Sequence, residues 1–353
     1  APKDDSKWGK AAAAAKEAID KIEGSSYYGL YYSDEPDNGY RNYMELFLPS
    51  KKWNKEYIFA RNQGTGYSDN IHQEKCMAAN GMGGWSGLCP TQELVDAYEM
   101  ANGSTPIIGY NADGTPIING ASGYSETGFA ATAGKHYPAG VYNMYVGREP
   151  RFYASINFNG QQWRGRQLEF WQGGKDGINV SKVDYCCTGY LLRKTADEGV
   201  DVINGKGGMK EASILFRVGS LYLDYAEALN EAEGPVDDVY KYVDAIRKRA
   251  GLPGLAKGLD KDKMRERIQH ERQIELAFEA GHRYFDCHRW KIAEKTDNGY
   301  MHGMNITATN KVDYSKRSTV GDSRVFEKKH YLFPIPQSEM DKRIGLVQSP
   351  YWE

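Results

Sequence analysis

The chain has 353 residues, of which 40% are hydrophobic and 26% are charged, and its formal net charge is −2. A chain of this length can bury a sizeable core in one large domain or in two ordinary ones. A charge so close to zero gives no bulk electrostatic reason to expect nucleic acid as a partner, and no apolar run approaches the length of a membrane span.

Tyrosine and cysteine usage bear on function in different ways. There are 26 Tyr against 11 Phe, and because Tyr combines a flat apolar ring with a hydrogen-bonding tip, this balance suits wet, polar, ring-shaped ligands. The five cysteines show no CxxC pair, so a structural zinc site is not expected. Cys76 and Cys89 could pair in an oxidising compartment, and a free buried thiol is the alternative for each cysteine.

The first predicted element is a helix over residues 6–23. Its run of alanines has the highest helix propensity available, and Trp8, Ala12, Ala15 and Ile19 form one apolar stripe. Such a stripe needs a partner helix. Because the first 200 residues offer few helices, we expect that partner in a segment that precedes this chain.

From residue 24 to residue 212 the sequence changes to short segments rich in Gly, Asn and Tyr. Residues 56–62 alternate like a strand, residues 91–100 predict a short helix capped by Thr91, and residues 151–163 predict a strand followed by an Asn-Gly turn. Long loops inside a compact chain usually carry function. We therefore expect the ligand-binding side of the protein here.

Helical order is predicted to return at Ser213. Residues 213–234 and 236–250 form a helix hairpin with apolar residues at helical spacing, which resembles a tetratricopeptide-type pair. A third helix is predicted after a cap at Asp260. It runs through the stretch "HERQIELAFEAGHRYFDCHRW" at residues 270–290.

That stretch raises the question of a catalytic or metal site. Glu271, Glu275 and Glu279 recur every four residues, and arginines stand three or four positions from them. A glycosidase acid would need a carboxyl kept protonated in an apolar pocket, whereas neighbouring arginines keep these carboxyls ionised. The three histidines fit no HExxH pattern. We therefore interpret the stretch as an ion-paired helix face packed against other helices.

Several collinear segments of the chain resemble the SusD/RagB family of outer-membrane nutrient-binding lipoproteins. They are "WGKAAAAAKEAID", "PTQELVDAYEM", "REPRFYASINFNG", "SLYLDYAEALNEAEG", "YVDAIRKRAGLPGL", "IQHERQIELAFEAGHRYFDCHRW" and "YLFPIPQSEMDKRIGLVQSPYWE". The resemblance covers essentially the whole chain. The sequence differs from the family at its N-terminal side, where members usually carry a lipobox cysteine and further helices.

The resemblance implies a mainly α fold, with tetratricopeptide-like hairpins, long irregular loops and few short strands. We expect one domain over 1–353, N-terminally incomplete, with a helical scaffold at 1–23 and 213–292. Residues 24–212 would form the loop-rich ligand side, and 293–353 a C-terminal extended segment.

The family resemblance also implies a function. The protein would be a lipid-anchored receptor at the cell surface of the outer membrane, which binds oligosaccharide or polysaccharide and passes it to a SusC-like TonB-dependent transporter. Peptide binding, as in RagB-type members, is the alternative, and a glycoside hydrolase is a third hypothesis without a coherent catalytic group. No catalytic residue, metal or cofactor is expected. Partners would be the glycan, the transporter and the N-terminal remainder of the same protein.

Candidate binding residues lie in two Gly-rich loops. Trp85, flanked by glycines that would leave its ring face accessible, is the central candidate, and the alternative is a Trp that plugs the loop onto the core. The full candidate set is Arg61, Asn62, Tyr67, Asp69, Trp85, Tyr110 and Tyr124. Sugar rings stack on aromatic faces while amide, acid and guanidinium groups bond their hydroxyls.

Overall fold

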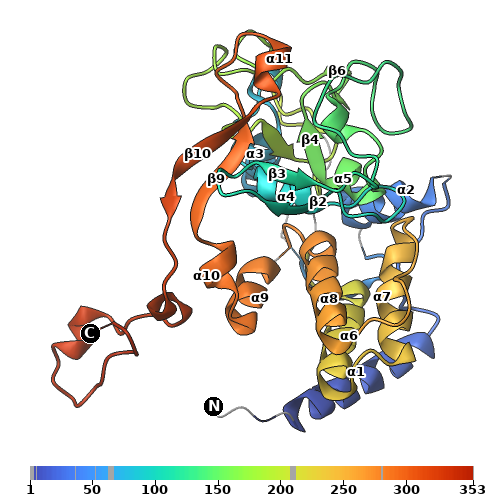
Figure 1. The fold of residues 1–353 in the computed structure, drawn as a ribbon, viewed down its shortest axis with the longest axis vertical. Coiled ribbons are helices and arrows are strands. Elements are labelled where there is room, and N and C mark those ends of the chain that lie inside the picture. Colours follow the sequence, from blue (N-terminus) through green and yellow to red (C-terminus); the bar gives the residue numbers. More distant parts are fainter. Residues whose placement is uncertain are drawn as a thin grey trace.

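The computed structural model describes Asp4 and residues 6–35, 37–51, 53–62, 67–206, 212–279 and 281–352. It has a group of long helices, a loop-rich body with short strands, and an arm at the C-terminal end (Figure 1). The helices are α1 (Ser6–Glu23), α2 (Asn38–Met44), α3 (Tyr67–Met77), α4 (Gln92–Ala97), α5 (Pro150–Ser155), α6 (Val218–Glu233), α7 (Asp237–Arg249), α8 (Lys261–Glu275), α9 (His282–Trp290), α10 (Ala293–Thr296), α11 (Lys311–Tyr314) and α12 (Gln337–Met340). These helices and the shortness of the strands confirm the predicted mainly α fold.

The strands pair two by two, and every pair is antiparallel. The pairs are β1 (Tyr57–Asn62) with β8 (Ala212–Arg217), β2 (Ile107–Tyr110) with β3 (Pro116–Ile118), β4 (Ile156–Phe158) with β7 (Tyr190–Leu192), β5 (Gln162–Trp163) with β6 (Arg166–Gln167), and β9 (Gly299–Met304) with β10 (Arg317–Arg324). Because the described residues contain no larger sheet, helices and loops position the side chains of any site.

α6 is the central helix of the scaffold and packs against α1, α7 and α8. Its sequence is apolar on most sides, as expected for a helix surrounded by others, and 12 of its 16 residues are buried. α7 begins with Asp237 and Asp238 and ends with basic residues, which complements the helix dipole. The predicted hairpin of α6 and α7 is confirmed.

α1 finds its partner inside the chain. Ala12, Ile19 and Ile22 are buried in one cluster with Leu221 and other residues of α6. The expectation that this partner precedes the chain is therefore wrong. The error came from treating α6 as one half of a closed hairpin, although α6 has a further apolar face that α1 covers.

The predicted third helix is broken in two. α8 begins at the Asp260 cap, where the side chain accepts a hydrogen bond from the Lys263 N–H at 2.8 Å, and it ends at Glu275. The Glu275 carbonyl accepts from the Tyr43 hydroxyl at 2.9 Å and from the Lys194 ammonium at 3.1 Å. These side chains satisfy a carbonyl that a continuing helix would have used. The one-helix prediction over residues 270–290 is wrong for this reason.

Two further local predictions are wrong, and others hold. Residues 150–155 form α5 instead of a strand, with Pro150 in the first turn of the helix, and residues 212–217 form β8 instead of helix. The predicted turn is present, since Gly160 has φ 87° and the Gln161 N–H donates to the Phe158 carbonyl at 3.1 Å. β1 is confirmed, and the helix at α4 is confirmed but shorter than predicted.

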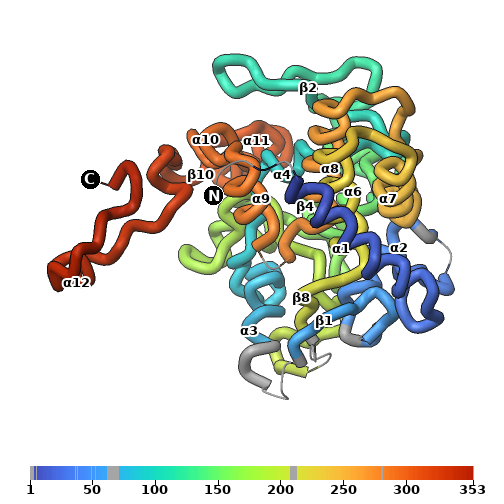
Figure 2. Tube along the Cα trace, turned by 90° about the horizontal axis from the view of Figure 1, so that it is seen from below, coloured from blue at the N-terminus to red at the C-terminus, as the bar shows by residue number. Residues whose placement is uncertain are grey.

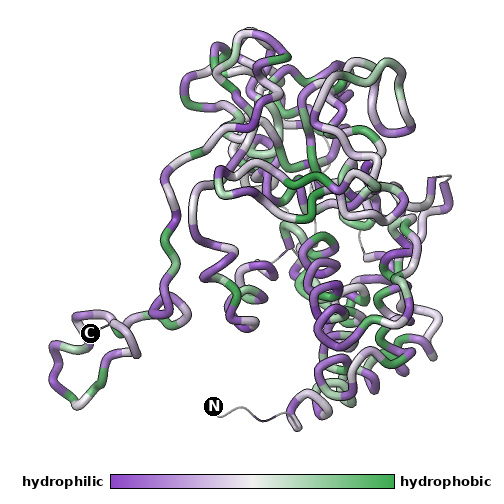
Figure 3. Tube along the Cα trace, in the orientation of Figure 1, coloured by the Kyte–Doolittle hydropathy of each residue, from purple (hydrophilic) through white to green (hydrophobic). Residues whose placement is uncertain are grey.

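The C-terminal arm, residues 325–352, leaves the body after β10 (Figure 1). Hydrophobic positions recur along it (Figure 3), and Phe333 and Val347 are 83% and 85% exposed. The arm folds on itself, because the Gln348 amide bonds both the N–H and the carbonyl of Ile335, at 2.7 and 3.0 Å. The candidate ligand-binding site lies in the body.

Candidate ligand-binding site

Glu271, Arg272 and Glu275 of α8 and Asp286 of α9 are buried, whereas Arg289 of the same stretch is exposed. The Glu275 carboxylate is 0% exposed and meets three guanidinium groups, from Arg151 at 3.1 Å, from Arg217 at 2.9 Å, and from Arg249. The ion-paired interpretation is therefore confirmed. The partners differ from those expected, because they come from α5, from the end of β8 and from α7 instead of from neighbouring turns of the same helix.

The pKa of Glu275 reflects this enclosure. Burial by itself raises the pKa, but Arg249, Arg217 and Arg151 outweigh it and bring the pKa down to about 2. The pKa of Glu279 is also lowered, by Arg217 and Lys194 against the effect of burial. Neither carboxyl holds a proton near neutral pH. Being ionised and enclosed, they cannot act as the acid of a glycosidase.

The candidate residues near α3 are only partly described. Arg61 lies on β1 and is exposed, while the side chains of Asn62, Tyr67 and Asp69 lie outside the described residues. Trp85 is 37% exposed, with the His72 ring at 5.2 Å and the Lys75 ammonium 5.3 Å from the centre of its ring. Its ring is therefore accessible in part and packed in part.

The glycines beside Trp85 serve packing more than accessibility. The loop after α3 folds back along the last turn of that helix, where the Trp85 N–H donates to the Lys75 carbonyl at 2.6 Å. Gly84 lies so close to this turn that a Cβ there would stand 2.1 Å from the Ala78 carbonyl oxygen. The flexible loop expected from the sequence is thus a closely packed helix end.

The two remaining candidates lie elsewhere. Tyr110, on β2, is 48% exposed and donates from its hydroxyl to Asp96 at 2.7 Å. Tyr124 is 6% exposed and bonds Glu126 at 2.7 Å, so its ring face is not open to a ligand. Figure 2 shows β2 and α3 on opposite sides of the body, and the structure does not bring Trp85 and Tyr110 together.

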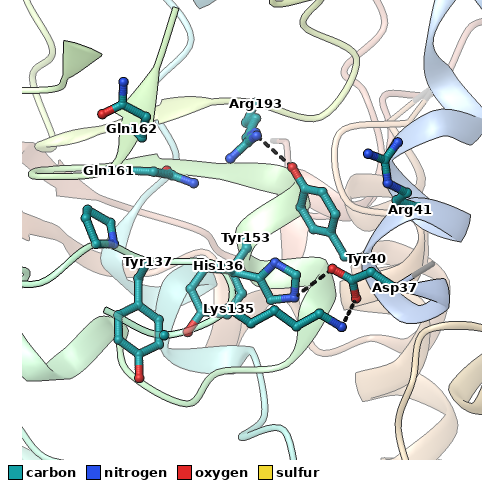
Figure 4. Close-up of a pocket in the computed structure, with 12 residues that line it drawn as sticks. Asp37, Tyr40, Arg41, Lys135, His136, Tyr137, Tyr153, Gln161, Gln162 and Arg193 are labelled. Atoms are coloured by element: carbon teal, nitrogen blue, oxygen red, sulfur yellow. Dashed lines mark hydrogen bonds and ion pairs between the residues drawn. The ribbon is translucent and has the colours of Figure 1, made fainter. Parts of the chain in front are cut away.

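A pocket of about 370 Å³ lies between α2, α5 and the loop before residue 139 (Figure 4). It is lined by Asp37, Tyr40, Arg41, Gly134, Lys135, His136, Tyr137, Pro138, Tyr153, Gln161, Gln162 and Arg193. A second hollow of about 420 Å³ shares Asp37, Lys135, His136, Tyr137 and Tyr153 with it. The two form one continuous surface, which we call the Tyr137 pocket.

Aromatic rings form one side of the Tyr137 pocket. The His136 ring stacks on Tyr40 at 4.8 Å and lies 5.2 Å from Tyr153, and the Tyr137 ring stacks on Tyr153 at 6.1 Å. Gly134 permits this arrangement, because a Cβ there would stand 2.3 Å from the Tyr137 ring. The Gly134 N–H donates to the Tyr137 carbonyl at 2.9 Å and closes the turn.

Polar groups form the other side. The Arg193 guanidinium donates to the Tyr40 hydroxyl at 2.6 Å and lies 4.7 Å from the centre of the Trp163 ring. Figure 4 shows the Gln161 amide and the Arg193 guanidinium directed toward one another across the pocket. The Gln161 nitrogen is buried and has no hydrogen-bond partner among the described residues. Donors therefore gather opposite the rings.

Asp37 holds the loop to α2. Its backbone is left-handed, with φ 77°, a conformation that Asp tolerates better than most residues. Its carboxylate does not cap α2 and instead pairs with Lys135 at 2.6 Å and His136 at 3.4 Å. Burial lowers the pKa of His136, an effect that Asp37 opposes, and burial raises the pKa of Tyr40. Near neutral pH the pocket therefore presents an uncharged imidazole and a protonated hydroxyl.

Sequence reasoning missed the Tyr137 pocket. Its residues come from many separate segments of the chain and form no motif. The usable signal was only that residues 24–212 are rich in loops and Tyr. The arrangement places flat rings beside hydroxyl, amide and guanidinium groups, which are the group types that a polar, ring-shaped ligand needs. Among the described residues, no group of three or more His, Cys, Asp or Glu side chains is arranged to hold a metal ion.

The described helices also bear on the relation to a membrane. In that part of the chain, no helix combines the length and the apolar character that crossing a bilayer requires.

Comparison with known proteins agrees with the resemblance seen in the sequence. Residues 48–352 match the SusD family. The SusD-like protein P25 of Formosa agariphila is 42% identical over 82 residues, which are 22% of this chain and 15% of that protein. The SusD-like protein P2 of the same organism is 29% identical over 154 residues, 40% of this chain and 26% of that protein.

Solved structures extend the likeness to the fold. A structure named BT4246 superposes with a TM-score of 0.76 at 26% identity, covering 99% of this chain and 63% of that one. A SusD-like protein from Bacteroides fragilis superposes with a TM-score of 0.70 at 27% identity, covering 98% of this chain and 62% of that one. The chain thus spans less than two thirds of the length of these relatives.

Proposed function

We propose that this chain, which belongs to the SusD family, binds oligosaccharide or polysaccharide and that the Tyr137 pocket is a contact surface for the sugar. The proposal extends to the location and partners that the family resemblance implies. The protein would be lipid-anchored at the cell surface of the outer membrane and would deliver its ligand to a SusC-like TonB-dependent transporter.

The observation that carries the proposal is the two-sided chemistry of the Tyr137 pocket. A pyranose ring has a patch of C–H groups on one face and hydroxyls around its rim. The ring of Tyr137 offers an apolar surface for the C–H face, while Gln162 and Arg193 offer donors for the hydroxyls. A volume of about 370 Å³ lies within the range of small-ligand sites.

Trp85 is proposed as a second, separate contact. Its ring is 37% exposed, lies apart from the Tyr137 pocket and could stack on another part of a long glycan. Arg61, which is exposed on β1, remains a further candidate. A polysaccharide long enough to touch both surfaces would gain affinity over a short oligosaccharide.

A glycan array followed by calorimetric titration tests the pocket. Tyr137→Ala removes a stacking surface, and Gln162→Ala removes an exposed amide without disturbing the rings. Stacking of one sugar on Tyr137 should contribute about 1 to 3 kcal/mol, so Tyr137→Ala should weaken binding by about 5-fold to 150-fold. Tyr27→Ala is the matched control, because that ring is 80% exposed and does not line the pocket.

Two outcomes would contradict the proposal. Unchanged affinity in both pocket variants, with the control also unchanged, would exclude the Tyr137 pocket as the sugar contact. Binding of a peptide library with no glycan bound by the same preparation would replace glycan binding by the RagB-type alternative.

A further inference from the structure

Three thiols come together in the loop-rich body. Cys89 lies between α3 and α4, while Cys186 and Cys187 lie just before β7. The sulfur atoms of Cys89 and Cys186 are 3.9 Å apart. Hydrogen bonding with Cys89 is the main influence on the Cys187 thiol, whose pKa it raises. We call Cys89, Cys186 and Cys187 the thiol cluster.

The backbone fixes the thiol cluster in place. The Leu192 N–H donates to the Leu88 carbonyl at 2.8 Å, which holds β7 against the residue before Cys89. Cys186 is 3% exposed and belongs to the same apolar core against which Cys89 packs. The contact between the two sulfurs is thus part of the core and not a chance approach of two mobile surface loops.

We propose that Cys89 and Cys186 form a disulfide in the mature protein, and that Cys187 remains as a free thiol beside it. The two sulfurs are neighbours at 3.9 Å, and forming the bond requires them to close to about 2 Å. Cys187 is exposed, whereas Cys186 is buried and Cys89 is half-buried beside it, so Cys186 is the partner that a stable bond would join to Cys89. Cys76, which the sequence suggested as a partner of Cys89, is not the cysteine at this contact.

The chemistry balances with an oxidant of a common class. Each thiol gives up one proton, one S–S bond forms, and two electrons pass to the disulfide of a thiol oxidoreductase, which is reduced to a dithiol. Such oxidants act in the bacterial envelope. Only this choice of oxidant rests on the proposed cell-surface location, and the geometry of the thiol cluster does not depend on glycan binding.

The surroundings indicate when the bond forms. In the folded protein, hydrogen bonding with Cys186 and burial raise the pKa of the Cys89 thiol. Because the thiolate is the reactive form, these thiols would react slowly once folded. The disulfide should therefore form while the chain is folding and then persist as a structural bond that closes a loop of 97 residues. That loop contains α4, α5 and residues 134–138 of the Tyr137 pocket.

Refolding in a glutathione redox buffer tests the proposal on the full chain. The reduced, unfolded protein is refolded with glutathione disulfide, acid-quenched, alkylated and analysed by intact mass and peptide mapping. The expected product takes up two fewer alkyl groups than the reduced protein and carries a cross-link from the Cys89 peptide to the Cys186–Cys187 peptide. The cross-link should survive in Cys187→Ser and Cys76→Ser and be absent in Cys89→Ser and Cys186→Ser.

Three results would overturn the proposal. Full alkylation of five cysteines after refolding would show that no bond forms, and a cross-link to Cys76 would place it elsewhere. A cross-link that survives Cys186→Ser but not Cys187→Ser would show that Cys89 bonds Cys187 instead of Cys186. The readout needs no glycan, so a failed disulfide and a failed binding function are told apart. Circular dichroism of every variant checks that the product is folded.

Discussion

Glu275 should be essential for stability and dispensable for binding. Glu275→Gln keeps the size and shape of the side chain and removes its charge. The carboxylate is 0% exposed and is shared by Arg151, Arg217 and Arg249. Loss of the charge would leave these buried cations partly uncompensated, which is far more costly than removing a surface charge.

The structure gives the magnitude in two ways. A carboxyl whose pKa falls from 4.5 in the unfolded chain to about 2 in the folded protein contributes about 3 kcal/mol at neutral pH. Removing one partner of a buried ion pair costs about 3 to 5 kcal/mol. We therefore expect Glu275→Gln to lower the free energy of unfolding by about 3 to 5 kcal/mol at pH 7.

The sign of the pH dependence follows from the lowered pKa. The contribution of Glu275 is fully present above pH 4.5, where the carboxyl would be ionised even in the unfolded chain. It is lost as the pH falls toward about 2, where the folded carboxyl takes up its proton. The difference in stability between the wild type and Glu275→Gln should therefore shrink between pH 4.5 and pH 2.

Urea denaturation followed by circular dichroism measures the difference, and calorimetric titration measures glycan affinity of the folded variant. Glu266→Gln is the matched control, since this residue is exposed on the same helix, and its unfolding midpoint should stay close to the wild-type value. An unchanged midpoint in Glu275→Gln would refute the ion-pair argument. Lost affinity with unchanged stability would instead make the stretch a binding site.

Two further predictions concern the loop after α3. Gly84→Ala should lower the melting temperature by several degrees, because its Cβ would stand 2.1 Å from the Ala78 carbonyl oxygen. Gly87→Ala should not lower it, because the nearest atom there would be 3.7 Å away. Equal melting temperatures of the two variants would show that the loop can move aside. Trp85→Ala should weaken binding of a long glycan about tenfold, a loss of about 1.4 kcal/mol, and should weaken binding of a short oligosaccharide less. Unchanged affinity for both ligands in calorimetric titration would show that Trp85 is not part of the binding surface.

The parts of the fold that the sequence predicts well are those with local signals. α7 and α8 follow from apolar spacing, from acidic first turns and from the Asp260 cap. β8 and α5 were predicted wrongly because their state depends on distant partners. β8 pairs with β1 across a separation of more than 140 residues, and a short apolar run cannot reveal such a partner.

The end of α8 illustrates the same limit within one helix. The sequence continues a helical pattern through Phe278 and beyond, but the carbonyl of Glu275 is taken by Tyr43 and Lys194, which are remote in sequence. Phe278 then adopts φ 63° and is 41% exposed. Side chains from other segments determine where α8 ends, and the spacing of apolar residues within the helix does not predict these contacts.

The candidate site was less predictable than the fold. Trp85 was predicted as a sugar contact because glycines surround it. Gly84, however, is required for close contact with the end of α3, and the sequence alone does not reveal this contact. The Tyr137 pocket instead depends on Gly134, which allows one ring to lie across a turn, and on the left-handed backbone of Asp37. Gly134 has no side chain, and the left-handed backbone of Asp37 cannot be inferred from its residue type alone.

α2 connects the scaffold with the candidate site. Tyr40 faces the Tyr137 pocket and bonds Arg193, whereas Tyr43, one turn later, donates to the carbonyl of Glu275. Asn42, between them, donates to the Arg249 carbonyl at 3.0 Å. A helix of seven residues is too short to be stable alone, so these contacts with the scaffold hold it. The end of α8 thus supports the helix that presents Tyr40 to the proposed site, while the Glu275 carboxylate stays among buried arginines.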